Sequence, residues 1–325
     1  MPLGPLFATL RPEDFFNASS PRVSLRPLNT SSRFVGAAYL ACQDQGTSTG
    51  TPSVGWLWSY PGSGNTAARL LIDAASGFTT GSVYSDGSLA EALAGEMKDA
   101  TNPTVANKMT FIKTHTFGTY EVLPAANPYE LADPSDWPHV HQTAMIVREP
   151  YAAMLAEHVR QMTGSHTGIL DRIDDYTAWE DKTQFMADHW QRTVEAQLKC
   201  TEGSPAEFCT KHNLVKLEDL LGADDRSEVL RTLVAFAGVR VDDKRLRCAF
   251  EHAETYHRHG SISVNEAFCA PSFSEAGRER LRNILDDTAK RVGYAPLDCG
   301  ATASNAAAMR REFVTSSEDA SWALP

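Results

Sequence analysis

The sequence lacks any apolar run of about 18 residues, the length that a membrane-spanning helix needs. Residues 1–10 also lack the basic start and the long apolar stretch of a signal peptide, so we expect neither kind of segment. Basic residues are scarce: 30 Lys and Arg stand against 41 Asp and Glu, giving a formal net charge of −11. Nucleic acids and anionic membranes attract basic surfaces, so the charge balance argues against both as general partners.

Closely spaced metal-ligand pairs are also missing. The six cysteines do not form CxxC pairs, which argues against a zinc site. Cys200–Cys209 is the easiest disulfide to place, while free and mostly buried thiols explain the cysteines at least as well. His139 and His141 alternate along a possible strand, but no third ligand accompanies them, so we expect no metal.

The composition divides the 325 residues into three parts. Residues 1–50 are rich in Pro, Ser, Thr and Gly, which predicts a loosely ordered lead-in. Residues 51–298 hold the periodic segments and are expected to form one domain, whereas the Ala- and Ser-rich residues 299–325 predict a frayed tail.

Within the central part, short apolar runs alternate with helical patterns. Strands are expected around 54–58 and at 109–113, 143–147 and 214–217. Helices are expected at 66–75, 150–162, 185–198, 227–237 and 275–291. This alternation is typical of an α/β fold with a parallel sheet and crossover helices.

The first strand runs into the sequence Y-P-G-S-G-N-T, directly before a helical pattern. The start of a helix offers unpaired N–H groups and a positive dipole end, and glycines let this backbone approach an anion. The loop therefore predicts a phosphate site, made by Gly62, Ser63, Gly64, Asn65 and Thr66. An ordinary strand-to-helix turn explains the glycines but explains the added Ser, Asn and Thr less well. Since the loop has no lysine, a P-loop kinase is disfavoured.

Two candidate catalytic residues, Lys113 and His115, stand where the strand at 109–113 ends. Ligands of doubly wound sheets gather outside the carboxyl ends of the strands, which would bring both side chains near the loop. His115 could take a proton from an acceptor hydroxyl, and Lys113 could neutralise a phosphate oxygen. Taken alone, His115 is better explained as a surface histidine beside a strand end, because the chain has ten histidines.

Further basic residues could bind a second phosphate. Arg148 follows the strand at 143–147 and could make a forked contact with phosphate or a structural ion pair. Arg258, His259 and Gly260 form a basic turn that could close over a polyanion, although a solvated turn is the more common meaning of such a cluster.

Two other polar segments have simpler interpretations. Glu218 and Asp219 are expected to be a turn or a helix cap rather than a carboxylate dyad. The polar loop at 164–168 is expected to line the acceptor side of the site.

The order of these motifs resembles that of the sulfotransferases that use 3′-phosphoadenosine 5′-phosphosulfate (PAPS). The motifs are Y-P-G-S-G-N-T, I-K-T-H, I-V-R-E-P-Y, V-K-L-E-D-L and R-H-G, across roughly residues 54–269. The sequence looks most similar to the branch found with WSC domains. The resemblance implies a three-layer α/β sandwich of the P-loop nucleotide hydrolase and sulfotransferase type, with a central parallel sheet.

The resemblance also implies residue roles in the transfer of a sulfuryl group to a carbohydrate or small-molecule hydroxyl. The loop at 62–66 would bind the 5′-phosphosulfate, with His115 as general base and Lys113 near the bridging oxygen. Contacts to the 3′-phosphate would come from Arg148, Arg258, His259 and Gly260. No metal is needed. Relatives are typically Golgi-luminal, so the expected location is the Golgi lumen if an N-terminal anchor has been lost and the cytoplasm otherwise.

Three positions depart from the pattern of the family. Gly62 stands where cytosolic members have lysine, Ala156 replaces a serine that binds phosphate, and Ala67 replaces a tryptophan that stacks on adenine. Lys113 or Arg69 could replace the missing lysine. These departures keep a non-catalytic PAPS- or PAP-binding module open as an alternative to an enzyme.

Overall fold

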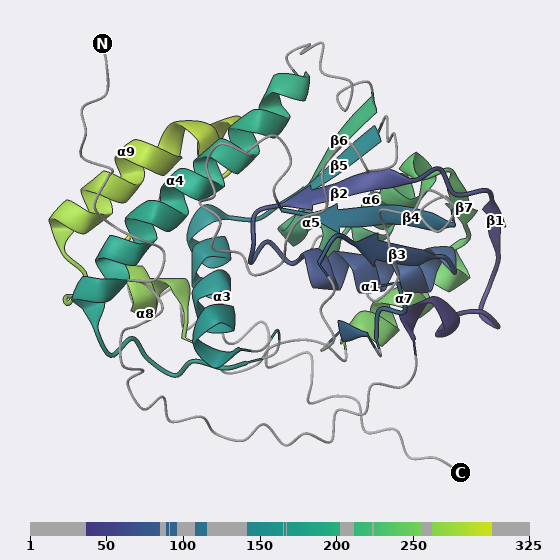
Figure 1. Ribbon diagram of the computed structural model, residues 1–325, viewed down its shortest axis with the longest axis horizontal. Helices are drawn as coiled ribbons and strands as arrows, with labels where there is room; N and C mark the ends of the chain where they lie inside the picture. Colours follow the sequence, from purple (N-terminus) through teal and green to yellow (C-terminus); the bar gives the residue numbers. More distant parts are fainter. Residues whose placement is uncertain are drawn as a thin grey trace.

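The computed structural model describes residues 37–84, 89–90, 92–95, 108–115, 142–164, 166, 168–201, 211–222, 224–254 and 262–300. Its centre is a five-stranded sheet with the order β3-β4-β2-β5-β6 (Figure 1). The strands are β2 (Gly55–Ser59), β3 (Thr79–Ser82), β4 (Met109–Thr114), β5 (Gln142–Val147) and β6 (Lys211–Lys216). All neighbouring strands run parallel. Strand β2 lies in the middle, where the chain turns from one half of the sheet to the other.

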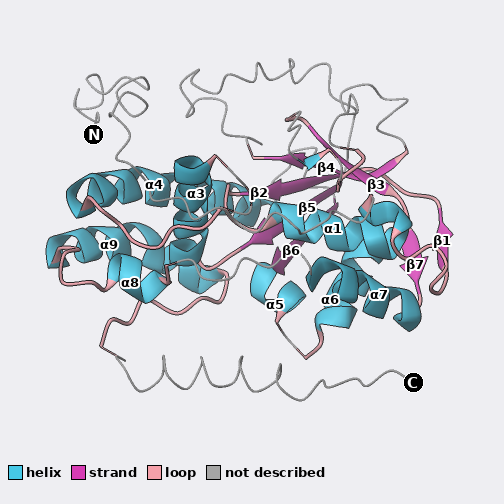
Figure 2. Cartoon of the chain, turned by 90° about the horizontal axis from the view of Figure 1, so that it is seen from below, coloured by secondary structure: helices cyan, strands magenta, loops and turns pink. Residues whose placement is uncertain are grey.

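Helices cover the sheet in two groups. On one side α1 (Asn65–Ser76), α5 (Leu217–Leu221), α6 (Arg226–Phe236) and α7 (Asp243–Glu254) share a core with Leu57, Phe111 and Ile146. The second group comprises α3 (Pro150–Thr163), α4 (Tyr176–Thr201), α8 (Val264–Phe268) and α9 (Glu275–Arg291). Its core includes Met145 and Val147, which alternate with Ile146 along β5. The two groups lie apart in Figures 1 and 2. The predicted three-layer α/β sandwich is confirmed.

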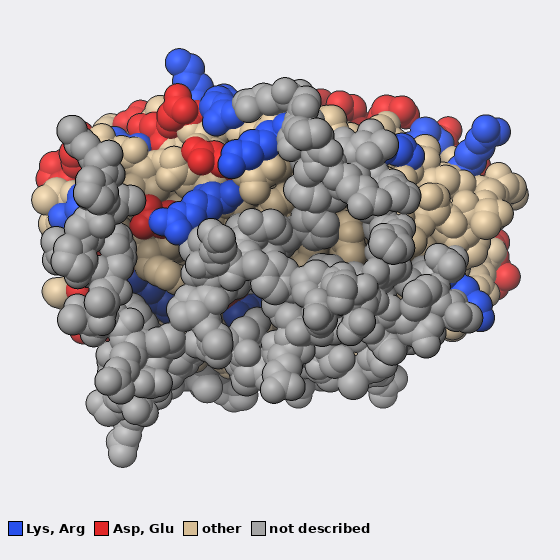
Figure 3. Space-filling view, turned by 45° about the horizontal axis from the view of Figure 1, so that its top comes forward, with Lys and Arg blue, Asp and Glu red and all other residues tan. Residues whose placement is uncertain are grey.

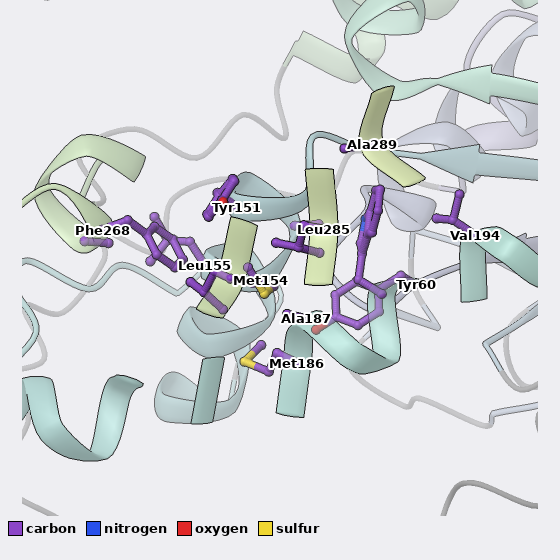
Figure 4. Packing of buried hydrophobic residues seen from close by; sticks show 14 of the residues in the cluster. Tyr60, Tyr151, Met154, Leu155, Met186, Ala187, Val194, Phe268, Leu285 and Ala289 are labelled. Carbon is purple, nitrogen blue, oxygen red and sulfur yellow. The ribbon is translucent and has the colours of Figure 1, made fainter. Parts of the chain in front are cut away.

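The end of β2 is anchored in the second core through Tyr60. This residue is 2% exposed and belongs to the same cluster as Ala187 of α4 and Leu285 of α9. Figure 4 shows the Tyr60 ring pointing in among these helices. The phosphate loop that follows therefore starts from a fixed point rather than from a solvated strand end.

Ordered structure also lies within the predicted lead-in. The short helix η2 (Ala38–Leu40) packs on α1, and β1 (Ser48–Gly50) pairs antiparallel with β7 (Val239–Val241). A disulfide joins Cys42 to Cys248 in α7, and a second joins Cys269 to Cys299. The interpretation as free thiols is wrong for these four cysteines. Cys209 lies outside the described residues, so the Cys200–Cys209 pair stays a prediction, as does the three-part division of the chain.

Most predicted elements are found with small shifts, and α9 has the expected bounds. One strand boundary was wrong, because β6 ends at Lys216 and Leu217 begins α5. Helix α4 begins at Tyr176, well before the predicted 185, and buries Trp179 in its first part. Strand β3 and helix α7 were missed because one is short and polar and the other is rich in charges.

Charged side chains are mixed on the surface. On the face in Figure 3, basic and acidic side chains of described residues lie beside one another. Ion pairs such as Arg278–Glu275 and Arg282–Glu279 show the same mixing along α9. Among the helices of the described ranges, none is both long and apolar enough to cross a membrane.

Candidate functional site

The predicted phosphate loop connects β2 to α1 at the carboxyl edge of the sheet. Gly62 and Gly64 have φ angles of 86° and 78°, which reverse the chain within a few residues. The N–H of Ser63 donates to the carbonyl oxygen of Tyr60 at 3.1 Å and closes the turn. Helix α1 then begins at Asn65 and runs for 12 residues, so its N-terminus faces the loop. This is the geometry that favours a bound anion.

Both loop glycines are also required by packing. A Cβ atom at Gly62 would lie 2.2 Å from the Ala153 carbonyl oxygen and 2.8 Å from the Glu157 nitrogen, both on α3. A Cβ atom at Gly64 would lie 2.5 Å from Cδ2 of Leu217. Position 62 therefore cannot carry a lysine without moving α3. The absence of a side chain at position 62 is explained by how closely the loop packs on this helix.

The loop contains polar atoms that have no hydrogen-bond partner among the described residues. They are Oγ of Ser63, which is 1% exposed, and Oδ1 of Asn65. The amide of Asn65 is used on its other side, where Nδ2 donates to Oγ of Ser59 at 3.1 Å and to the Leu57 carbonyl at 3.3 Å. A buried hydroxyl without a partner costs free energy. A phosphate oxygen in the loop would accept a hydrogen bond from the Ser63 hydroxyl, so the loop fits an anion.

His115 is joined to the strand that enters the loop. Its Nδ1 lies 2.7 Å from the carbonyl oxygen of Ser59, and 3.3 Å from Ser59 Oγ. Because a carbonyl oxygen only accepts, Nδ1 carries the proton and Nε2 keeps its lone pair. Burial, and then the charge of Lys113, hold the pKa of His115 well below its usual range. At neutral pH the imidazole is uncharged and able to accept a proton at Nε2.

Lys113 lies in β4 and His115 directly follows that strand, and the charge of Lys113 acts on the His115 ring. Lys113 is 5% exposed, and its Nζ lies 5.6 Å from the ring centroid of Tyr84. Its Cα is in register with that of Leu57 in β2, two residues before Ser59. The structure thus brings the predicted base, the predicted cation and the strand before the phosphate loop to one place.

Arg148 reaches the phosphate loop from the opposite side. Its Nη1 donates to the Gly62 carbonyl oxygen at 3.0 Å. Burial lowers the pKa of Arg148, and the nearby Glu218 and Glu149 counteract that shift. In this structure the guanidinium braces the loop, and its contact with a 3′-phosphate stays a prediction.

The acidic residues beside Arg148 cap and connect elements. The carboxylate of Glu149 accepts from the N–H groups of Tyr151 and Ala152, so it is the N-cap of α3. Glu218 accepts from the Glu149 N–H at 3.1 Å and from the Tyr294 hydroxyl at 2.7 Å. Glu218 lies in the first turn of α5, whose N-cap is Lys216, so the helix-cap alternative is wrong for Glu218.

Sequence reasoning missed a polar cluster on α3 and α4 behind the loop. The buried Glu157 carboxylate accepts from Nε of Arg160 at 2.7 Å and from Nη2 at 2.6 Å. The His189 ring lies 5.1 Å from that of Tyr60, and burial lowers the pKa of His189 to about 4. The charges of Arg160 and His189 also contribute to the low pKa of His115. The Glu-x-x-Arg spacing in a predicted helix was the only available signal, and it did not point to the loop.

Some predicted residues cannot be compared with the described structure, and one is found away from the loop. Arg258, His259 and Gly260 lie outside the described residues, as do both histidines of the possible metal pair. Arg69 is fully buried and donates to the side chain and the carbonyl of Thr80 on β3. It is therefore the wrong candidate to replace a loop lysine. Within the described ranges, no group of three or more metal-binding side chains occurs.

Known proteins similar to this chain include WSCD family members from insects. One from Drosophila pseudoobscura pseudoobscura is 30% identical over 213 residues, 64% of this chain and 58% of the relative. One from Aedes aegypti is 31% identical over 209 residues, 62% of this chain and 56% of the relative. One from Drosophila melanogaster is 29% identical over 212 residues, 64% and 57% of the two chains. The chain thus spans somewhat over half the length of these relatives.

No family model matches the chain. Among solved structures, a retinol dehydratase in complex with androsterone and the inactive cofactor PAP superposes with a TM-score of 0.43 and 14% identity. That superposition covers 75% of this chain and 83% of the other. At the level of sequence, the chain is similar to WSCD family proteins over up to 64% of its length.

Proposed function

We propose that the protein is a PAPS-dependent sulfotransferase that transfers a sulfuryl group to a hydroxyl of a carbohydrate or small molecule. The observation that carries the proposal is the 2.7 Å contact between Nδ1 of His115 and the Ser59 carbonyl. It joins a neutral imidazole to the strand that leads into the phosphate loop. The order of the motifs and the similarity to WSCD family members support the same conclusion.

The residues of the loop fit the phosphosulfate end of PAPS. The N–H groups at the start of α1 and the unsatisfied Ser63 hydroxyl are the proposed donors to its oxygens. Arg148, Arg258, His259 and Gly260 are the proposed ligands of the 3′-phosphate. When bound, PAPS supplies the sulfuryl group and leaves as PAP, so the protein has to position the acceptor and stabilise charge.

His115 is the proposed general base. Ser59 holds the proton on Nδ1, which leaves Nε2 to remove the proton of the acceptor hydroxyl as its oxygen attacks sulfur. The lowered pKa keeps His115 uncharged before the reaction. After the proton has moved, the ring carries a positive charge, which Ser59 O stabilises through the Nδ1 proton.

The positive charge that a loop lysine supplies in cytosolic members must come from elsewhere, because Gly62 has no room for a side chain. Lys113 is the proposed source, since it stands two residues before His115 and its charge acts on that ring. Arg160 is the proposed second source. The Glu157 carboxylate fixes the Arg160 guanidinium through Nε and Nη2. The charge of Arg160 also lowers the pKa of His115.

The disulfides bear on the proposed location. Disulfides such as Cys42–Cys248 and Cys269–Cys299 form and persist in oxidising compartments. They support a luminal setting such as the Golgi, and they argue against the cytoplasmic alternative.

A non-catalytic PAP-binding module is the second candidate function. It is favoured by Ala67 and Ala156, which lack the side chains that contact the nucleotide in the sulfotransferase pattern. The structure removes Gly62 from this argument, because packing on α3 accounts for that glycine.

The substitution His115→Ala separates the two candidates. For an enzyme, we expect sulfate transfer to fall by about 10²- to 10⁴-fold, the usual contribution of general acid-base catalysis. PAP affinity, measured by calorimetry, should stay near the wild-type value because the loop is intact. His212→Ala, on the edge strand β6, is the matched control and should keep full activity. Undiminished transfer by His115→Ala contradicts the base assignment, and a wild-type protein that binds PAP without transfer to any acceptor is the non-catalytic module.

A further inference from the structure

Tyr84 touches both predicted catalytic residues, although no motif in the sequence singles it out. It follows β3 and is 8% exposed. Its hydroxyl oxygen accepts a hydrogen bond from the backbone N–H of His115 at 2.8 Å. Its ring stacks on the His115 imidazole, with centroids 5.3 Å apart and planes at 25°. The same ring lies 5.6 Å from Nζ of Lys113. One side chain thus contacts the main chain and the ring of the base, as well as the neighbouring cation.

Tyr84 is itself held in place by the chain next to it. Oγ of Ser82 accepts from the Tyr84 N–H and donates to the Tyr84 carbonyl oxygen, each at 3.0 Å. These two bonds fix the main chain directly after β3, an edge strand that pairs with β4. The hydroxyl and the ring therefore approach His115 from a fixed position rather than from a solvated loop.

The contacts on His115 divide into two sets. Ser59 decides which ring nitrogen carries the proton, because its carbonyl accepts from Nδ1. Tyr84 decides where the ring lies, because it holds the backbone N–H and covers one ring face. His115 directly follows the last residue of β4, where the ladder no longer fixes the chain, so the Tyr84 hydroxyl replaces a strand partner at this point.

We propose that Tyr84 is a positioning residue of the sulfuryl transfer, which keeps Nε2 of His115 aimed at the acceptor hydroxyl and Lys113 beside it. The role in transfer rests on the proposed function, whereas the effect on His115 does not. A misplacement of about 1 Å in a reacting group can cost about a hundredfold in rate, so a residue that only orients the base can be worth nearly as much as a direct contact.

Two substitutions separate the hydroxyl from the ring. Tyr84→Phe keeps the ring and removes the acceptor of the His115 N–H, and Tyr84→Leu removes both contacts. Tyr176→Phe is the matched control, because it also loses a 2.8 Å bond between a tyrosine hydroxyl and the main chain, here to the Glu266 carbonyl in α8. Each variant is the full chain, and its folding is checked by circular dichroism and thermal unfolding.

The first readout needs neither donor nor acceptor. In ¹⁵N-histidine-labelled protein, with His115→Gln as the assignment reference, the wild-type His115 should show one tautomer protonated at Nδ1. The groups that act on its titration are Lys113 of β4, Arg160 of α3 and His189 of α4, all unchanged in these variants. In Tyr84→Leu we expect the tautomers to mix and the His115 pKa to rise toward the ordinary value, because the ring loses its cover.

The second readout is steady-state kinetics. For Tyr84→Phe we expect kcat to fall about tenfold, and for Tyr84→Leu up to about a hundredfold, with the KM of donor and acceptor nearly unchanged. Tyr176→Phe should match the wild type in both readouts. A Tyr84→Leu variant with wild-type kcat and a single Nδ1-protonated His115 overturns the proposal. If the wild type transfers no sulfate yet Tyr84→Leu still alters the His115 spectrum, the proposed function fails while the effect on His115 stands.

Discussion

The two sides of the phosphate loop are built in different ways. On the side of β4, the residues Lys113 and His115 are held by their neighbours while Nε2 of His115 has no bond to a described residue. On the side of β5, Nη1 of Arg148 and both carboxylate oxygens of Glu149 bond to main-chain groups of the protein. In the proposed function the first side acts on the acceptor, whereas the second side also holds the loop in shape.

The difference shows that electrostatics alone does not identify chemistry. Burial shifts the pKa of His115 on one side and of Glu149 on the other. The carboxylate of Glu149 nevertheless accepts hydrogen bonds from the N-terminus of α3. The imidazole of His115, which is bonded through Nδ1, keeps Nε2 as an acceptor. A structural group has its polar atoms hydrogen-bonded within the protein, whereas a reactive group keeps an atom that can bond to a ligand.

The loop itself offers the strongest test of this division. Gly62→Ala forces a side chain into the Ala153 carbonyl and a φ of 86°, so the loop must shift away from α3. We expect PAP affinity, measured by calorimetry, to fall at least about tenfold, with transfer falling in proportion, because displaced N–H groups no longer converge on the phosphate.

Gly164→Ala is the matched control for this substitution. Gly164 has a φ of 63°, but no atom of the described residues lies within 4 Å of the place where its Cβ would stand. The replacement therefore costs only backbone strain, about 1 kcal/mol of stability. PAP affinity should not change. Equal losses of affinity in both variants would show that packing on α3 does not determine the conformation of the loop.

Loss of the contact between Arg148 and the loop should have the next largest effect. In Arg148→Ala the Gly62 carbonyl loses its charged donor, a bond worth about 1.5–3 kcal/mol. We expect PAP affinity to fall about tenfold, while the ¹⁵N signals of His115 stay as in the wild type. A changed His115 tautomer in this variant would mean that the two sides are coupled, which breaks the comparison.

The titration of His115 tests the catalytic side directly. Its pKa lies below the ordinary value of about 6.5 because of burial and of the Lys113 charge. The transfer rate should therefore stay flat as pH falls through 6.5 and decline only when the folded protein takes up the proton. In Lys113→Met we expect the pKa to rise, since one positive neighbour is lost, and NMR titration measures it. A pKa that does not move excludes Lys113 as an influence on the base.

The lowered pKa of His115 also determines how the stability of the fold depends on pH. The unfolded chain binds the His115 proton at a higher pH than the folded chain, so stability falls as pH drops below about 6.5. The same sign holds for His158, whose pKa burial lowers to about 3.

The smallest effect is expected at Glu149. Glu149→Ala removes the N-cap of α3 and should cost about 1 kcal/mol of stability, measured by urea unfolding. Because the carboxylate faces main-chain groups, kcat should be nearly unchanged. A loss of kcat comparable to that of His115→Ala would move Glu149 to the catalytic side.

The sequence was sufficient for features that are local along the chain. The strand, the glycines and the helix that make the loop are consecutive, and Lys113 and His115 mark the end of one strand, so their proximity follows from parallel topology. Tyr84 and Arg160 could not be found in this way. Their roles depend on the pairing of β3 with β4 and on the packing of α3 against the loop, which leave no periodic signal.

The cysteines and Gly62 illustrate the same limit. Cys42 and Cys248 are 206 residues apart, so no spacing rule predicts their disulfide. The missing lysine at Gly62 was one of the departures that kept a non-catalytic module open, whereas the structure shows the main chain of α3 packed against that position. The effect of a residue that departs from a motif can therefore be judged only once the atoms packed around it are known.

The binding of PAP tests the central claim most directly. Thermal unfolding is measured for the full chain with PAP, with ATP and magnesium, and in buffer. The account predicts that PAP at about 100 times its dissociation constant adds roughly 2.7 kcal/mol of stability, while ATP adds little. Stabilisation by ATP and magnesium equal to that by PAP, or no stabilisation by PAP, would contradict a phosphosulfate site in the loop.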